Sequence, residues 1–304
     1  MNAIEIKNLR KNFGQKQALN GLNMTVPQGA IYGFIGENGS GKSTTEKLIC
    51  GLLVPSGGEI KLFGKDYRDG DVRAKVGVLI ETPGCFPNYS VWNNLMLQAA
   101  NLSIENAQEE VRKVLKVVRM EGSASNKFKN CSLGMKQRIG IAMALLDNPA
   151  LLVLDEPING LDADGMRIMR EVLVDITKNY NCTVVVSSHI LGELEKIATH
   201  YGIVRGGRMI KEMTAAELEA DCPTYVALKT KDMAATKTLL EKKYTRVAEE
   251  NGYIRVYDSA LPEDIVSFLY AHGVVVTEIK TDKISLEEYY IDLMKGEARN
   301  ANAV

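Results

Sequence analysis

Residues 36–44, GENGSGKST, are the most informative segment of the sequence for the fold. The segment has the spacing G-x-x-x-x-G-K-[ST], follows the apolar run AIYGFIG (30–36) and opens a helix-like stretch. In a strand–turn–helix of this kind, glycines let successive backbone N–H groups face a phosphate, and the helix N-terminus adds partial positive charge. Lys42 can reach the β- and γ-phosphates, and the Ser43 hydroxyl can ligate Mg²⁺. The segment therefore predicts an α/β fold of the P-loop NTPase type.

The predicted phosphate contacts come from this one continuous loop. They are Gly36, Asn38, Gly39, Ser40, Gly41, Lys42, Ser43 and Thr44. A glycine turn that only caps a helix is the alternative interpretation. The strand before the loop and the helix after it favour phosphate binding, because this is the context in which the motif holds a nucleotide.

Further apolar runs alternate with helix-like stretches through the first two thirds of the chain. LLVLDEP (151–157) and TVVVSSH (183–189) are short, rich in branched residues and end in polar side chains. Such runs are typical of buried parallel strands, whose carboxyl ends carry the chemistry of an α/β sheet. Residues 86–148 have a mostly helical pattern and predict a helical insertion. The alternating start, AIEIKNLRKNF (3–13), predicts an antiparallel β-subdomain, and GIVRGGRMI (202–210) predicts a hairpin.

The pattern changes near residue 216. From there the sequence predicts strands and helices in the order βαββαβ, the ferredoxin-like arrangement, followed by a final helix. We therefore expect two domains, a nucleotide-binding domain at 1–215 and a small α+β accessory domain at 216–304. The second part has no chemical motif. A packing or dimer-stabilising role is expected for it, with a regulatory or partner-contacting role as the alternative.

The composition excludes several classes of protein. A net charge of −1 over 304 residues gives no reason to expect a nucleic-acid partner. The five cysteines are odd in number and widely spaced, which favours buried thiols in a reducing cytosol over a disulfide framework. The start, MNAIEIKNLRKNF, carries charges throughout and predicts no signal peptide. The apolar runs are shorter than the ~20 residues that span a bilayer, so work at a membrane needs another chain.

Two adjacent carboxylates and a histidine follow the apolar runs. Asp155 is expected to hold Mg²⁺, and Glu156 to act as the general base for an attacking water. His189 ends a strand that should neighbour the strand of the phosphate loop, so we expect it to contact the γ-phosphate. The alternatives are a solvated loop for the carboxylates and a structural role for the histidine.

Phe13 precedes the phosphate loop in RKNFGQKQAL. An aromatic ring at such a position can stack on adenine, because stacking requires a flat apolar face and no charge. A place in the hydrophobic core is the alternative. We expect stacking on the base.

These elements, in this order, resemble the nucleotide-binding subunit of ATP-binding cassette (ABC) transporters over about residues 4–215. The resemblance rests on Phe13, GENGSGKST, CSLGMKQR (131–138), LLVLDEP, NGLD (159–162) and SSH (187–189). It implies an ATPase that uses ATP and Mg²⁺ and pairs with a second nucleotide-binding subunit. We expect the two subunits to be copies of the same chain, a homodimer. The resemblance also implies a separate transmembrane permease and a position on the cytoplasmic face of the cell membrane.

In this family the loop at 131–138, called the signature, acts on the nucleotide of the partner subunit. The resemblance implies that Ser132, Gly134 and the helix N-terminus reach the γ-phosphate held by the partner. A bare glycine suits a place where backbone must approach phosphate. The loop departs from the usual L-S-G-G-Q at three positions, and Met135 replaces the glutamine. A methionine cannot supply the polar contact of that glutamine, so the rate of hydrolysis cannot be predicted from the loop. The role of the loop across the interface is still expected.

Two further residues enter through the resemblance. Asp162, the last residue of NGLD, is assigned to the nucleotide site. Glu81 stands where the family carries the glutamine of its Q-loop. Both side chains offer an oxygen to Mg²⁺ or to the attacking water, so Glu81 is expected to assist catalysis and to join Ser43 and Asp155 as a Mg²⁺ ligand.

Glu81, together with SLGMKQR and SSHILGELE, is similar to a subgroup that exports bacitracin or gives self-immunity to lantibiotic peptides. A general efflux subunit with an unrelated glutamate is the alternative within the family. A soluble ABC-type ATPase without a transport role is the alternative outside it. A metabolite kinase would leave CSLGMKQR unexplained. The transported molecule cannot be identified from the sequence, because its contacts lie in the permease.

Overall fold

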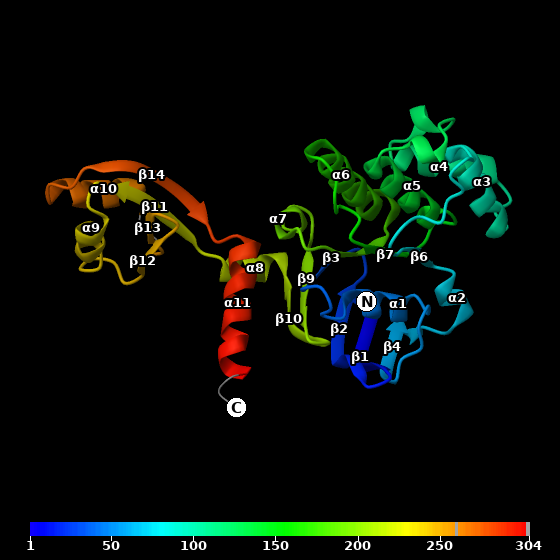
Figure 1. Ribbon diagram of the computed structural model, residues 1–304, viewed down its shortest axis with the longest axis horizontal. Helices are drawn as coiled ribbons and strands as arrows, with labels where there is room; N and C mark the ends of the chain where they lie inside the picture. The colour runs from blue at the N-terminus through cyan, green and yellow to red at the C-terminus, as the bar shows by residue number, and fades with distance from the viewer. Residues whose placement is uncertain (259–260, 302–304) are drawn as a thin grey trace. The chain divides into compact units, whose positions relative to one another are not determined.

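The loop at 36–44 lies between a buried strand and a helix in the structure, a computed structural model that describes residues 1–258 and 261–301 (Figure 1). The chain divides into two compact units, Met1–Ala215 and a second unit that begins at Ala216. Every residue of the predicted nucleotide site belongs to the first unit. Within the described residues, no helix combines the length and the apolar character needed to cross a bilayer.

A six-stranded sheet of order β10-β9-β3-β8-β7-β6 carries the loop. Its strands are β3 (Ile31–Ile35), β6 (Val76–Leu79), β7 (Leu151–Asp155), β8 (Thr183–Ser187), β9 (His200–Arg205) and β10 (Arg208–Thr214). Strands β3, β6, β7, β8 and β9 run parallel to one another, and β10 pairs antiparallel with β9. The central strands β3, β7 and β8 are apolar and buried almost throughout. Their carboxyl ends, where the predicted motifs follow, meet at one edge of the sheet.

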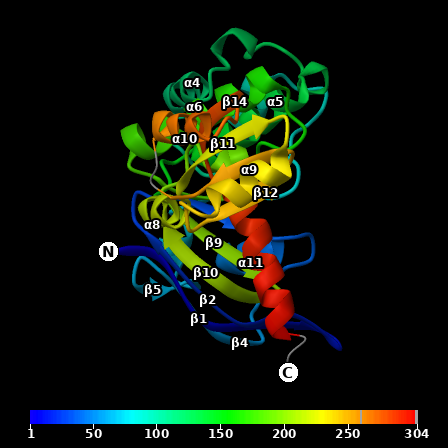
Figure 2. The same ribbon diagram turned by 90° about the vertical axis from the view of Figure 1, so that its left-hand side faces the viewer.

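A second, antiparallel sheet of order β2-β1-β4-β5 supports the first. Its strands are β1 (Asn2–Phe13), β2 (Lys16–Pro27), β4 (Gly57–Leu62) and β5 (Lys65–Asp66). Buried side chains of β1 and β2 share one hydrophobic core with Phe34, Leu48 and Val153. Strand β10 lies beside β2 (Figure 2), and the Thr25 backbone N–H donates to the Glu212 carboxylate at 2.9 Å. The predicted antiparallel β-subdomain is confirmed.

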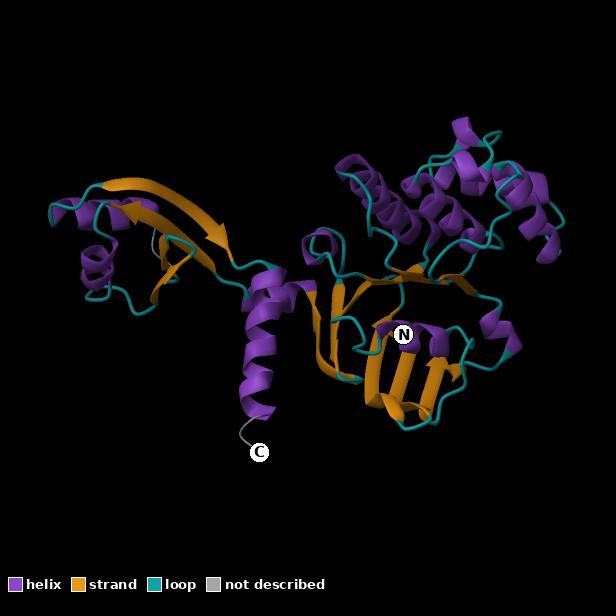
Figure 3. Cartoon of the chain, viewed as in Figure 1, coloured by secondary structure: helices purple, strands orange, loops and turns teal. Residues whose placement is uncertain are grey.

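Helices fill the connections of the first unit (Figure 3). Outside the insertion they are α1 (Lys42–Ile49), α2 (Gly70–Arg73), α6 (Ala163–Tyr180) and α7 (Leu191–Leu194). Between β6 and β7 the chain forms α3 (Val91–Asn101), α4 (Ala107–Val117), the 3₁₀ turns η1 (Glu121–Ser123) and η2 (Phe128–Asn130), and α5 (Leu133–Leu145). Helices α3 and α4 pack their buried positions against each other and against α5, which is buried over most of its surface. The predicted helical insertion is confirmed.

The second unit contains an antiparallel sheet of order β12-β13-β11-β14. Its elements are β11 (Thr224–Thr230), α9 (Met233–Leu240), β12 (Val247–Glu250), β13 (Tyr253–Val256), α10 (Pro262–Ala271) and β14 (Val276–Lys283), with α8 (Ala215–Asp221) before them and α11 (Leu286–Ala301) after. Leu240 of α9 and Leu269 of α10 share a core with Val226, Leu228 and Ile254 of the sheet. This succession is that of a ferredoxin-like fold, with both helices on one face of the sheet.

Candidate nucleotide-binding site

The turn between β3 and α1 accepts glycine alone at its two key positions. Gly41 has φ 112°, and a Cβ there would lie 2.7 Å from the Leu19 side chain. A Cβ on Gly36 would lie 2.5 Å from the Val204 carbonyl oxygen. The backbone is therefore bare at the N-terminus of α1, where its N–H groups can face an anion.

The polar groups of this loop fit a phosphate. Lys42 is buried, and its ammonium donates to the carbonyl oxygens of Gly36 at 2.6 Å and Glu37 at 3.2 Å. The Ser40 hydroxyl is also buried and has no hydrogen-bond partner among the described residues. A buried hydroxyl without a partner is costly, so its presence beside an enclosed cation favours a ligand with oxygen atoms. Ser43 and Thr44 lie in the first turn of the same helix.

The carboxyl ends of β7 and β8 bring the two predicted carboxylates together with a serine. Asp155 and Ser187 are register partners on the paired strands. The Ser187 hydroxyl donates to Asp155 Oδ1 at 2.9 Å, and it accepts from the backbone N–H of Glu156 at 3.1 Å. Glu156 has φ 48°, a left-handed backbone, directly after β7 ends at Asp155.

Glu156 and His189 form a contact pair. Glu156 Oε2 lies 2.7 Å from His189 Nδ1, and the histidine is half exposed while the carboxylate is largely covered. A carboxylate held by one imidazole nitrogen leaves the second nitrogen available to a ligand. This arrangement brings together the residues expected to act on the attacking water and on the γ-phosphate.

Glu46 is a buried carboxyl group that carries no signal in the sequence. It lies on α1 with no solvent exposure, and neither carboxyl oxygen has a hydrogen-bond partner of good geometry among the described residues. Burial, and next the nearby Asp155 charge, raise the pKa of Glu46 to about 8. An acidic residue within STTEKLI belongs to no motif, and only the fold shows that this side chain is buried near Asp155.

The residue at the Q-loop position, Glu81, forms an ion pair with α1, the helix that follows the phosphate loop. Glu81 follows β6 with φ 65°, and its carboxylate lies 2.9 Å from the ammonium of Lys47 on α1. The Glu81 side chain is 71% exposed, so the ion pair itself contributes about 0–1 kcal/mol to stability. The exposed carboxylate remains open to an incoming ligand.

The signature loop begins α5. The Ser132 hydroxyl caps this helix and accepts from the Met135 backbone N–H at 3.3 Å. Gly134 lies in the first turn, and a Cβ there would meet only the Leu161 side chain, at 3.5 Å. Asp162 caps α6 by accepting from the Gly165 N–H at 2.8 Å. The signature and NGLD segments are thus neighbours, while among the described residues no hydrogen bond joins Ser132 to the phosphate loop.

Phe13 lies at the end of β1 rather than in the core. Phe13 is 48% exposed, and the ammonium of Lys11 is 5.0 Å from its ring centroid. The alternative of a core position is therefore wrong. One face of an exposed ring can receive a planar base, as the stacking interpretation requires.

Comparisons with known proteins agree with this geometry. Residues 19–159 match the family described as "ABC transporter". The chain is 36% identical over 298 residues to a bacitracin transport ATP-binding protein of Enterococcus faecalis, covering 96% of both chains. It is 38% identical over 209 residues to a lantibiotic transport ATP-binding protein of Streptococcus pyogenes, covering 69% of this chain and 90% of the other.

A solved structure shares the fold of the first unit. It is the dimer of an ATP-binding cassette in a post-hydrolysis state with ADP and Pi, 25% identical to this chain. The match has a TM-score of 0.63 and covers 70% of this chain and 98% of the cassette. The predicted P-loop NTPase fold of the ABC type is confirmed.

Proposed function

This chain belongs to the ATP-binding subunits of ABC transporters, and we propose that it couples MgATP hydrolysis, at sites shared by two copies, to export of a bacitracin- or lantibiotic-type peptide. The chain is a nucleotide-binding ATPase of a transporter complex. We further propose that it uses Mg²⁺, forms a homodimer and lies on the cytoplasmic face of the membrane.

The hydrolytic roles rest on one observation, the contact of Glu156 with His189 beside Asp155 at the sheet edge. Glu156 removes a proton from the attacking water, and His189 contacts the γ-phosphate. Lys42 leaves its loop carbonyls to bind the phosphates. Ser43 and Asp155 offer a hydroxyl and a carboxylate, oxygen ligands that Mg²⁺ prefers, and Mg²⁺ would neutralise charge on the phosphates.

The proposal of a shared site is supported by the signature loop. Ser132 and Gly134 lie at the exposed N-terminus of α5, where backbone N–H groups can meet an anion. Within the described residues of one chain they make no hydrogen bond to the phosphate loop. The cassette solved with ADP and Pi is a dimer. A second copy would bring Ser132, Gly134 and the neighbouring NGLD segment to the nucleotide held by the first.

The peptide class is supported by the length of the match to the bacitracin transport protein. That match covers 96% of both chains, so it includes the second unit as well as the cassette. Deleting the gene should therefore lower the inhibitory concentration of bacitracin or of a lantibiotic for the host. A copy encoding the wild-type chain should restore it, and a copy encoding Glu156→Gln should not. Unchanged inhibitory concentrations across a panel of both peptide classes would reject this substrate class.

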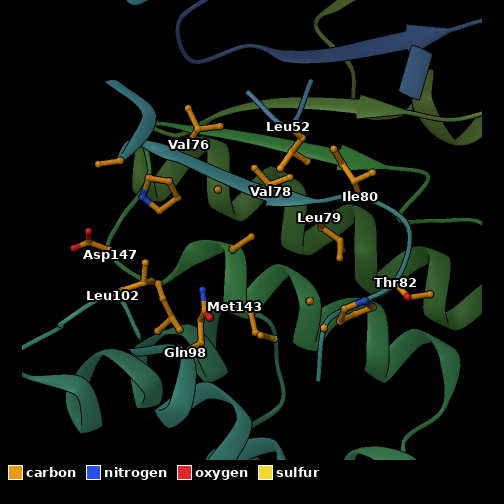
Figure 4. Close-up of a pocket in the computed structure, with 18 residues that line it drawn as sticks. Leu52, Val76, Val78, Leu79, Ile80, Thr82, Gln98, Leu102, Met143 and Asp147 are labelled. Carbon is orange, nitrogen blue, oxygen red and sulfur yellow. The ribbon is translucent and has the colours of Figure 1, made fainter. Parts of the chain in front are cut away.

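A groove on the first unit is the proposed docking site for the permease. It has a volume of about 380 Å³ and lies between β6 and the helices α3 and α5. Figure 4 shows Val78, Leu79, Leu102 and Met143 around it. Thr82 also lines the groove, and two half-exposed aromatic rings follow it a few residues later in the chain. A groove beside the Q-loop position, lined by both apolar and polar side chains, suits an inserted segment of a membrane subunit.

The two aromatic rings are Phe86 and Tyr89, whose centroids are 5.3 Å apart. Changing both to Ala should weaken binding of the permease roughly tenfold or more, because interface aromatics are common hot spots. The ATPase activity of the isolated subunit should stay the same. Tyr270→Ala, at an exposed tyrosine of the second unit, is the control for pull-down. Loss of soluble protein in the double variant would instead assign these rings to packing.

A further inference from the structure

Ser187 connects the two carboxylates of the proposed site. We propose that Ser187 is a positioning residue for ATP hydrolysis, whose single hydroxyl fixes the Asp155 carboxylate and the Glu156 backbone as one unit. This inference rests on the proposed roles of Asp155 and Glu156. Ser187 itself does not contact the nucleotide in this proposal, because it lies in β8 with no solvent exposure.

The Ser187 hydroxyl makes one hydrogen bond as a donor and one as an acceptor, and the buried Glu46 carboxyl group also lies beside it. The hydroxyl hydrogen goes to Asp155 Oδ1 at 2.9 Å, and the hydroxyl oxygen receives the Glu156 N–H at 3.1 Å. The parallel pairing of β7 and β8 places Asp155 and Ser187 opposite each other, so the first bond follows from strand register. A methyl group at this position would remove both bonds and leave the Glu156 N–H without this partner.

The second bond acts on a strained residue. Glu156 has φ 48°, and a left-handed backbone costs a non-glycine residue roughly 1–2 kcal/mol. Such a conformation persists only where its surroundings fix it. The Ser187 hydroxyl holds the N–H of this residue, and the Glu156 carboxylate then reaches His189 Nδ1 at 2.7 Å. One buried hydroxyl therefore sets the direction of the metal ligand and of the general base.

The buried carboxyl group of Glu46, which lies near Asp155, is the reason that Asp155 needs the hydrogen bond from Ser187. Glu46 is fully buried next to Asp155, and its carboxyl oxygens lack partners of good geometry among the described residues. Without the Ser187 hydroxyl, the Asp155 carboxylate would lose its hydrogen bond at Oδ1. The buried Glu46 carboxyl group would then remain beside the Asp155 carboxylate. Removing Ser187 should therefore affect the Mg²⁺-dependent step more than the binding of ATP alone.

The test compares Ser187→Ala with a matched variant of the same strand. Thr183 is also buried, and its hydroxyl accepts from the Gly29 N–H at 3.0 Å, at the opposite end of β8. Thr183→Val removes one buried hydrogen bond without touching the site. For each variant, kcat, the Mg²⁺ concentration for half-maximal ATPase activity, ATP binding in EDTA and thermal unfolding are measured on the full chain.

Ser187→Ala should lower kcat and raise the half-maximal Mg²⁺ concentration, with a combined loss of roughly 10- to 100-fold, the range for a hydrogen bond to a charged group. Its ATP affinity in EDTA should equal that of the wild type. Ser187→Thr, which keeps the hydroxyl, should recover most of the activity. Thr183→Val should lose stability without a change in Mg²⁺ dependence. Wild-type kcat and Mg²⁺ dependence in Ser187→Ala would overturn the proposal, as would equal losses in Ser187→Ala and Thr183→Val.

Two further variants separate this inference from the proposed function. Asp155→Asn and Glu156→Gln are measured beside Ser187→Ala under the same conditions. If both retain ATPase activity, the roles assigned to these carboxylates fail. If both lose activity while Ser187→Ala retains it with unchanged Mg²⁺ dependence, the positioning role of Ser187 alone fails.

Discussion

Glu156→Gln should lower ATP turnover by about 10²-fold or more and leave ATP bound between two chains. The amide keeps the shape of the carboxylate and can keep a hydrogen bond to His189, but it cannot remove a proton from water. Binding of the nucleotide and closing of the dimer should therefore continue while hydrolysis stops. Steady-state ATPase assays measure the first effect, and size-exclusion chromatography with Mg-ATP measures the second.

The control for this variant is Glu59→Gln, at an exposed glutamate of strand β4. It makes the same chemical change far from the sheet edge and should hydrolyse ATP like the wild type, without a stable dimer. Near-normal turnover in Glu156→Gln would remove Glu156 from the role of general base. Slow turnover without an ATP-dependent dimer would mean that the site is not shared.

A second large loss of activity is expected from two substitutions, Lys42→Ala and Ser132→Arg, which lie on opposite sides of the proposed interface. Lys42→Ala removes the buried ammonium that the loop carbonyls hold in readiness for phosphate. A hydrogen bond to a charged group corresponds to roughly 10- to 100-fold in affinity, so ATP binding should fall by that amount. Ser132→Arg places a bulky cation at the start of α5 and should prevent the signature loop from closing on the partner's nucleotide. Each homodimer should be inactive.

The Ser132→Arg variant needs a control, because Ser132 also caps α5. Removing an N-cap costs about 1 kcal/mol of stability. Ser90 caps α3 in the same way, accepting from the Asn93 N–H at 3.0 Å. Ser90→Arg should therefore show a similar fall in thermal stability while the isolated subunit keeps its ATPase activity. Equal loss of activity in both variants would attribute the effect of Ser132→Arg to the cap.

The fold could be predicted from the sequence because its strongest signals are local. Glycine spacing between a strand and a helix identifies the phosphate loop. Short apolar runs that end in polar residues identify β7 and β8. Asp155, Glu156 and His189 were predicted for the same reason, since each follows such a run directly. Their proximity then follows from parallel strand order.

Other parts of the site could not be predicted, because they depend on which side chains meet across elements. Ser187 is one of two adjacent serines, and only the register of β8 against β7 shows which of them reaches Asp155. Glu46 looks like an exposed helix residue in the sequence, yet it is fully buried. The ion pair of Glu81 with Lys47 likewise requires the positions of β6 and α1. The contribution of Ser132 across an interface stays a prediction.

The most direct measurement mixes the Lys42→Ala and Ser132→Arg chains, allows subunit exchange and then measures nucleotide trapped in verified hybrid dimers. If the signature acts across the interface, each hybrid has one site with both lesions and one site with neither. Trapping of ATP, about one per hybrid dimer, should therefore return in the mixture and in neither homodimer. If Ser132 serves only its own chain, every site in the hybrid carries a lesion. Hybrid dimers that trap no nucleotide would contradict the shared site.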